Sequence, residues 1–218
     1  MKLSCKLKKN FLSETKCELN IHGMVTATLV GSATEVFDLP MQERYYVSLG
    51  DRVYSGVTML FPEKENVFLT ITKRNASFSL DVQGARLEVL MLDRLLGALC
   101  DEGKLLYLNA WEKTAFFGML YLDLNQRDAI LETPYLLEIK EALDVLGLPE
   151  LSERLGRAID ACELDLPLDP MKKLTPQEET AMVESYHILW SLAENAPWDE
   201  EEHTRVRIYD FIYENTKN

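Results

Sequence analysis

The sequence predicts an α+β protein in which an antiparallel β-rich part with one inserted helix precedes an all-helical part of about four helices. Two observations support this prediction. Apolar and polar residues alternate over much of residues 1–130, as they do in half-buried strands. From Pro134 onward apolar residues recur every three to four positions, as they do on one face of a helix. We therefore predict a β-rich part over residues 1–130 and a helical part over residues 131–218.

Composition describes an ordinary folded protein of one or two domains. The chain has 218 residues, of which 47% are hydrophobic and 27% charged, with only 10 Gly and 8 Pro. These proportions exclude a disordered or collagen-like chain. The four cysteines, Cys5, Cys17, Cys100 and Cys162, form no CxxC pair. We therefore expect reduced, mostly buried thiols rather than a disulfide framework or zinc site.

No segment of the sequence predicts a membrane span. The most apolar stretch, residues 87–99, is interrupted by Glu88, Asp93 and Arg94 and is too short to cross a bilayer. No apolar leader precedes Cys5 near the N-terminus. We therefore expect a cytoplasmic protein that does not bind membranes.

Negative charge is confined to one half of the sequence. The formal net charge is −13, with a pI near 4.7. Residues 1–110 contain 13 basic and 13 acidic side chains, whereas residues 111–218 contain 10 basic and 23 acidic ones. This excess of acids argues against nucleic acid as a partner. Four lysines gather in the neutral half, and we interpret them as protection of an edge strand: Lys2, Lys6, Lys8 and Lys9.

Strands are expected where the alternation is clearest. They are separated by short polar segments such as residues 62–66 and 73–76, which are typical of turns. Because parallel neighbours need long crossover connections, short turns favour an antiparallel meander. The strands expected from this pattern cover residues 3–7, 17–21, 25–29, 45–49, 53–61, 67–71 and 78–82.

The stretch that follows has a mixed pattern. Residues 86–101 fit either a strand or a helix, and we predict a helix because the apolar pattern is longer than a normal strand. Two further strands are expected at residues 105–110 and 115–124, joined by a turn at residues 111–114.

Helices are expected in the last third of the chain. One apolar stripe is formed by Leu136, Ile139, Leu143 and Leu146, and a second by Leu151, Leu155, Ala158, Ile159 and Cys162. Gly147 is placed to end the first helix and Pro149 to begin the next. Residues 164–170 form a Pro-containing connector, after which Thr175 and Glu178 match a capping box. A last helix over residues 198–214 places Val206, Tyr209 and Ile212 inward.

The sequence lacks the common motifs of nucleotide-binding and hydrolytic enzymes. It contains no GxGxxG after a strand, no GxxxxGK[ST], no GxSxG and no HExxH, so we expect no cofactor. Its acidic composition is similar to that of small interaction proteins such as immunity proteins, secretion chaperones and nucleic-acid mimics. This similarity is one of composition, and no motif supports it.

Two Glu-x-x-His pairs provide the one pattern that resembles a metal site. Glu184 with His187 and Glu200 with His203, together with Glu138 and Glu153 from other helices, match the ligand inventory of a di-iron carboxylate bundle. With Met182 at 0°, however, the apolar stripe of its helix centres near about 40°, whereas Glu184 falls at about 200°. We therefore favour surface residues over metal ligands.

Acidic residues at two helix starts support a binding function. In the first turn of a helix, carboxylates complement the macrodipole and can also face a partner. Our hypothesis is a non-enzymatic protein-binding module, of the inhibitor, immunity or chaperone type, that engages a basic protein partner. The residues expected to take part are Asp199, Glu200, Glu201, Glu202, Glu178 and Glu179 as charges, and Tyr213 as an exposed anchor. The alternatives are a metal-dependent enzyme using Glu184, His187, Glu200 and His203, or a small-ligand sensor using the β-rich part.

Overall fold

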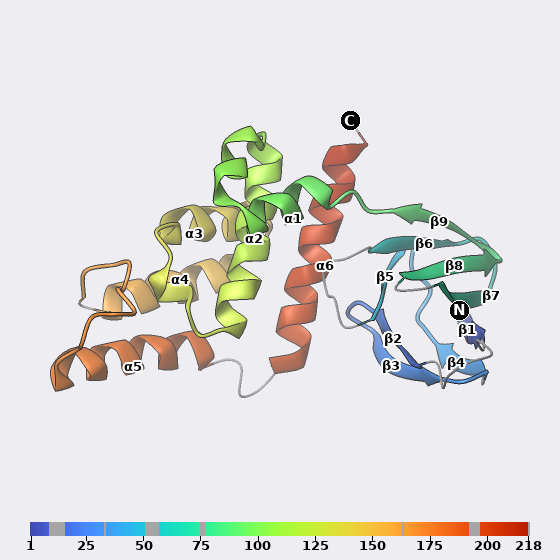
Figure 1. Ribbon diagram of the computed structural model, residues 1–218, viewed down its shortest axis with the longest axis horizontal. Coiled ribbons are helices and arrows are strands. Elements are labelled where there is room, and N and C mark those ends of the chain that lie inside the picture. Colours follow the sequence, from blue (N-terminus) through green and yellow to red (C-terminus); the bar gives the residue numbers. More distant parts are fainter. Residues whose placement is uncertain are drawn as a thin grey trace. The chain divides into compact units, whose positions relative to one another are not determined.

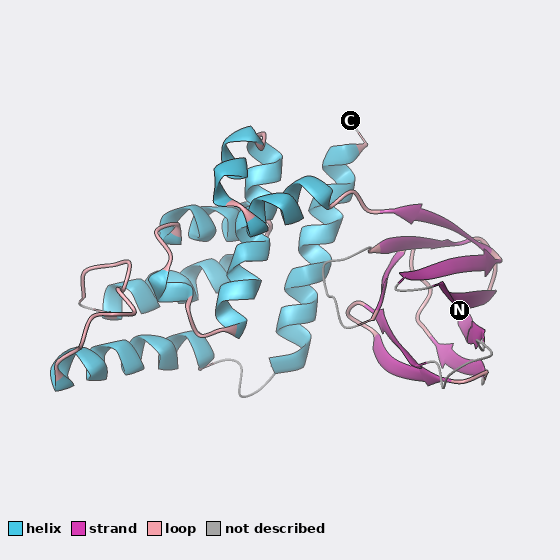
Figure 2. Cartoon of the chain, viewed as in Figure 1, coloured by secondary structure: helices cyan, strands magenta, loops and turns pink. Residues whose placement is uncertain are grey.

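The computed structural model describes residues 1–8, 16–32, 34–50, 57–74, 77–162, 164–191 and 197–217. The chain divides into two compact units, Met1–Leu92 and Asp93–Asn218, and each is described here by itself. All described strands lie in the first unit and all described helices in the second (Figure 1, Figure 2). The predicted α+β class with a helical C-terminal part is therefore confirmed.

The β unit contains two sheets. The four-stranded sheet has the order β4-β1-β7-β8 and the five-stranded sheet the order β3-β2-β5-β6-β9. The strands are β1 (Lys2–Lys8), β2 (Lys16–Ile21), β3 (Val25–Val30), β4 (Thr34–Asp38), β5 (Tyr45–Leu49), β6 (Thr58–Pro62), β7 (Asn66–Arg74), β8 (Ser77–Gln83) and β9 (Ala85–Val89).

The hydrophobic core of the β unit combines residues from both sheets. Leu3, Cys5 and Leu7 face inward from β1, because alternate residues of a strand share one face. Leu19 and Ile21 of β2 belong to the same buried cluster. In β1 and β2 the period-two pattern of the sequence therefore identified the inward face correctly.

Strand pairing differs from the expected meander. β1 pairs in parallel with β7, with Leu3 opposite Val67, and antiparallel with β4. β6 and β7, which are joined by the expected turn at residues 62–66, belong to different sheets. β1 is an interior strand, so the interpretation of its lysines as protection of an edge is wrong. Alternation identifies the buried face of a strand but not its neighbours.

The helical unit is built from six α-helices and two short 3-10 helices in the described residues. They are α1 (Asp93–Cys100), η1 (Glu102–Tyr107), α2 (Ala110–Gln126), η2 (Ile130–Glu132), α3 (Leu136–Val145), α4 (Pro149–Ala161), α5 (Pro176–Trp190) and α6 (Pro197–Thr216). α2 packs against α3 and α6, while α4 lies between α3 and α5 (Figure 1). None of these helices is long and apolar enough to cross a membrane.

Residues 86–124 depart from the sequence prediction. The single helix expected at residues 86–101 is the strand β9 followed by α1, and the strands expected at residues 105–110 and 115–124 are η1 and α2. Most of the middle of α2 is buried, including Phe116, Gly118 and Met119, so no polar face reveals the helical period. The signal that marks its start is a capping box between Asn109 and Glu112. This early helical stretch also moves the boundary between the units to Leu92, whereas the sequence placed it at residue 130.

The helix boundaries expected from caps are confirmed for three helices. Gly147 has φ +73° and follows α3, where the amide of Leu148 donates to the Leu143 carbonyl in a Schellman arrangement. Pro149 begins α4, and the Thr175 and Glu178 capping box begins α5. The apolar stripe of α3 is buried as expected.

Candidate functional site

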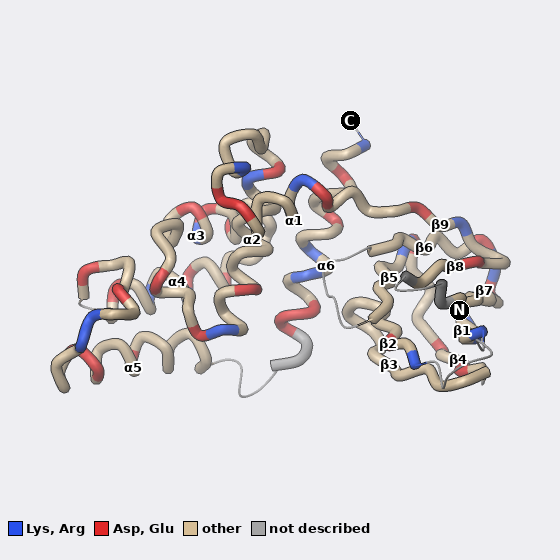
Figure 3. The backbone as a smooth tube through the Cα atoms, in the orientation of Figure 1, with Lys and Arg blue, Asp and Glu red and all other residues tan. Residues whose placement is uncertain are grey.

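Charge is divided very unevenly between the two units. The chain has 36 acidic and 23 basic residues, of which Asp93–Asn218 contains 26 acidic and 12 basic ones. The remaining 10 acidic and 11 basic residues lie in Met1–Leu92. The formal charges of the two units are therefore −14 and +1, which sum to the −13 of the chain. Figure 3 shows acidic positions along the length of the helical unit rather than at one end.

The acidic run at the start of α6 is paired with arginines of the same unit. A carboxylate oxygen of Glu200 lies 2.8 Å from Nη1 of Arg154 on α4. Glu201 and Glu202 both pair with Arg205, which lies four and three residues further along α6, respectively. Glu201 also accepts a hydrogen bond from the side-chain amide of Gln126. The side chain of Asp199 lies outside the described residues. Most of the charge expected to face a partner is thus compensated within the chain.

Arg154 lies at the centre of a buried polar cluster. Only 4% of its side chain is exposed, and its Nη1 also donates to the Leu189 carbonyl of α5 at 3.3 Å. Tyr121 of α2 is close to the same ion pair, and burial raises the pKa of its hydroxyl to about 12 while Arg154 opposes this shift and Glu200 adds to it. The cluster joins four helices. Its role in the structure is to hold them together.

The remaining residues expected to bind a partner have different surroundings. The pKa of Glu178 is lowered to about 2. The larger cause is the hydrogen bond from the backbone amide of Thr175, and the next is the Lys172 ammonium at 3.0 Å. Glu179 is exposed in the first turn of α5. Tyr213 is only 4% exposed, and the Lys217 ammonium lies 4.0 Å from its ring centroid. The aromatic anchor expected on the surface is therefore buried.

The four residues of the alternative metal site are not brought together. Glu184 and His187 are exposed on α5, where the His187 ring lies 6.2 Å from the Trp190 ring. Glu200 is engaged by Arg154, and His203 is exposed on α6. Within the described ranges, no group of three or more His, Cys, Asp or Glu residues is placed to hold a metal ion.

The exposed face of α3 combines apolar and acidic side chains. Leu137 and Val145 are 67% and 62% exposed, and Glu138, Glu141 and Asp144 are exposed beside them. At 100° per residue these five positions fall within an arc of about 120°, opposite the buried stripe. In the described residues the carboxylates of Glu138 and Glu141 have no ion-pair partner, while Asp144 lies 4.0 Å from Lys140. We call these five residues the α3 face.

The α3 face has a signal in the sequence that lies outside the apolar stripe of the helix. Two large apolar residues, Leu137 and Val145, lie eight positions apart and outside the inward-facing set. An apolar residue on the polar face of an amphipathic helix is common singly, but two of them among three acids form a small mixed surface.

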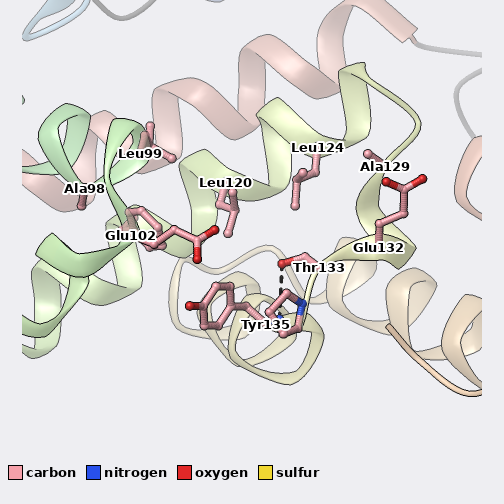
Figure 4. A pocket seen from close by; sticks show the side chains of 11 residues that line it. Ala98, Leu99, Glu102, Leu120, Leu124, Ala129, Glu132, Thr133 and Tyr135 are labelled. Atoms are coloured by element: carbon pink, nitrogen blue, oxygen red, sulfur yellow. Dashed lines mark hydrogen bonds between the residues drawn. The ribbon is translucent and has the colours of Figure 1, made fainter. Parts of the chain in front are cut away.

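A pocket of about 250 Å³ lies between α1, η1, α2 and the segment that leads into α3. Leu99, Phe116, Leu120 and Leu124 supply its apolar walls. Glu102 and Glu132 contribute carboxylates from opposite ends (Figure 4). The sequence prediction placed residues 115–124, which contribute one wall, in a strand, so the pocket was not expected.

Comparison with protein-family models, with curated proteins and with solved structures gives no match for this chain.

Proposed function

We propose that this chain is a non-enzymatic protein-binding module whose acidic helical unit engages a basic partner, as proteins of the inhibitor, immunity or chaperone type do. The observation that carries the proposal is the α3 face, on which two exposed apolar side chains lie beside three carboxylates. The charge of −14 on the helical unit supports the same function, because a strong field of one sign accelerates encounter with an oppositely charged surface.

The α3 face has the two components that a specific interface requires. Burying Leu137 and Val145 against a partner removes apolar surface from water, which contributes about 1.5–3 kcal/mol for each fully buried side chain. Glu138 and Glu141 are free to pair with lysines or arginines of the partner. Apolar anchors give affinity, whereas the surrounding charges select the partner and set the association rate.

Pairing within the chain is the reason for preferring the α3 face to the start of α6. Glu200 and Glu202 already have arginine partners at 2.8 and 3.0 Å, respectively. Recruiting Glu200 to another protein would leave the buried guanidinium of Arg154 without this counter-ion, which is costly. Recruiting Glu202 would break one of the two carboxylate contacts of the buried Arg205. Glu141 has no ion-pair partner in the part of the chain that the structure describes, so it can bind a cation without breaking a described contact.

The test is affinity capture from the native host's lysate with matched variants. The bait proteins are wild type, the double variant Glu138→Lys and Glu141→Lys, and the control Glu184→Lys, which reverses one charge at an exposed position of α5 where the double variant reverses two. We expect wild type and control to retain one basic protein in stoichiometric amount and to release it at high salt, and the double variant to lose it.

Two results of the capture would contradict the proposal. One is equal retention of the basic protein by all three baits, which would remove the α3 face from the interface. The other is the absence of any stoichiometric protein from the wild-type capture.

A further inference from the structure

The pocket of the helical unit combines an apolar interior with an acidic rim. Leu120 and Leu124 of α2 point into it, and Leu99 of α1 closes one side (Figure 4). Its volume of about 250 Å³ is enough for a short alkyl chain or one long side chain. Because Leu99, Leu120 and Leu124 make part of its wall aliphatic, an apolar ligand group gains free energy on packing against them.

No described residue compensates the charge of the two carboxylates at the rim. Glu102 on η1 and Glu132 on η2 are both exposed, and in the described residues neither has a hydrogen bond or an ion pair. Burial and then the charge of Glu132 raise the pKa of the neighbouring Tyr186 to about 12. Because both carboxylates are exposed, the negative charge at this rim can pair with a cationic ligand.

Two hydroxyl groups add hydrogen-bonding capacity. Thr133 is only 7% exposed, and its Oγ1 accepts from the Tyr135 amide at 3.3 Å. A hydroxyl oxygen has two lone pairs, so the hydroxyls of Thr133 and Tyr135 can each accept a hydrogen bond from a cation. Figure 4 shows the Tyr135 ring beneath the carboxylate of Glu102.

We propose that this pocket binds an organic cation, namely a primary ammonium or guanidinium group carried on an apolar stem. The stem packs against Leu120 and Leu124, and the cation pairs with one of the two carboxylates, Glu102 or Glu132, which lie at opposite ends of the pocket. An anionic ligand is excluded by repulsion from both carboxylates, and a neutral one leaves their charge uncompensated.

Two sources provide this chemistry: a free alkylamine, or a lysine or arginine side chain of a protein partner. For the second source the inference rests on the proposed function, and it then names the group of the partner that is recognised. The pocket and the α3 face adjoin each other in sequence, because Pro134 and Tyr135 line the pocket and α3 begins at Leu136.

The test is a titration of the purified full chain with three six-carbon probes: hexylamine, hexanol and hexanoate. Methyl NMR shifts of Leu120 and Leu124 report binding inside the pocket. We expect hexylamine to shift these methyls with a dissociation constant at least about fivefold lower than that of hexanol, and hexanoate to produce no shift. The double variant Glu102→Gln and Glu132→Gln preserves side-chain shape, and we expect it to weaken hexylamine binding at least tenfold.

The control variant Glu184→Gln removes an exposed carboxylate of α5 and should leave hexylamine binding unchanged. The proposal is overturned if hexylamine and hexanol bind equally, if the double variant binds hexylamine as wild type does, or if no probe shifts the two leucines. Each result separates cation recognition from nonspecific apolar binding.

The two sources are distinguished with the captured basic partner. If the cation belongs to that partner, the Glu102→Gln and Glu132→Gln variant binds it more weakly and hexylamine displaces it. If the ligand is a free amine, partner binding is unchanged while hexylamine binding is lost. If the Glu138→Lys and Glu141→Lys variant retains the partner as wild type does while hexylamine binds the pocket, only the proposed function is contradicted. If that variant loses the partner but hexylamine does not bind the pocket, only the pocket proposal is contradicted.

Discussion

The guanidinium of Arg154 on α4 lies 2.8 Å from the carboxylate of Glu200 on α6. Both residues belong to the helical unit, and they are separated by 46 positions in the sequence. This pair changes the interpretation of the acidic run that begins α6. At least one of its carboxylates stabilises the packing of helices, and charge available for a partner is found instead on α3.

The ion pair predicts a large effect of Glu200 on stability. Replacing Glu200 with Ala leaves the guanidinium of Arg154 buried without its counter-ion, and we expect the free energy of unfolding to fall by about 2–3 kcal/mol, because Glu200 itself is partly exposed. Urea unfolding measures this change. The control Glu184→Ala should stay within about 0.5 kcal/mol of wild type. A similarly small effect at Glu200 would contradict the structural role assigned to the pair.

Replacing Gly118 with Ala should change stability in the direction opposite to the one that helix propensity predicts. A Cβ at this position of α2 would lie 2.6 Å from Cδ1 of Leu146 and 3.2 Å from Ile208. We expect Gly118→Ala to destabilise the protein by about 1–3 kcal/mol, although Ala is the better helix former.

The matched control for this prediction is Gly156→Ala on α4. Its Cβ would meet the flexible end of Lys140 at 3.1 Å, which can move aside. This substitution should raise stability by up to about 1 kcal/mol through helix propensity. Stabilisation by both substitutions would show that α2 is not as tightly packed as described.

Glu178 predicts a pH-dependent contribution to stability. Its pKa of about 2 in the folded chain lies below the ordinary value of 4.5, mainly because the Thr175 amide donates to its carboxylate. The contribution is therefore complete above pH 4.5 and is lost as pH falls toward 2. The measurement is the difference in Tm between wild type and Glu178→Gln. It should be largest above pH 5 and disappear near pH 2, and a difference independent of pH would contradict the assignment.

Thiol reactivity provides a test of burial in both units. Cys100 is exposed, whereas Cys5, Cys17 and Cys162 are buried, and burial raises the pKa of Cys5 to about 12. A disulfide reagent at pH 8 should therefore modify one thiol quickly in the folded protein, and all four after denaturation. Cys100→Ser should abolish the fast phase. More than one fast thiol in the folded protein would contradict the described packing.

Sequence patterns predicted elements that have a polar side and a clear cap. α3 was found from its apolar stripe and from Gly147, whose positive φ favours glycine. α2 was missed because residues such as Phe117 and Tyr121 are buried around most of its circumference. Alternation in β1 identified Leu3 as buried, but its parallel partner Val67 is 64 positions away and no local pattern specifies it.

The candidate sites depend on contacts that sequence spacing does not determine. Arg154 is buried and pairs with Glu200, which lies 46 positions away in the sequence, so no local spacing specifies this contact. The pocket is assembled from separate segments, and its carboxylates Glu102 and Glu132 are 30 positions apart. In contrast, Leu137 and Val145 lie on one helix, and their position outside the buried stripe of α3 can be seen in the sequence.

The most direct test of the central claim is the association rate of the captured basic partner, measured against ionic strength. The claim is that the α3 face attracts the partner. We therefore expect the Glu138→Lys and Glu141→Lys variant to associate about tenfold more slowly at low salt, with a flatter dependence on salt, and Glu184→Lys to associate much as wild type does. Equal slowing by both variants, or no slowing by either, would contradict the claim.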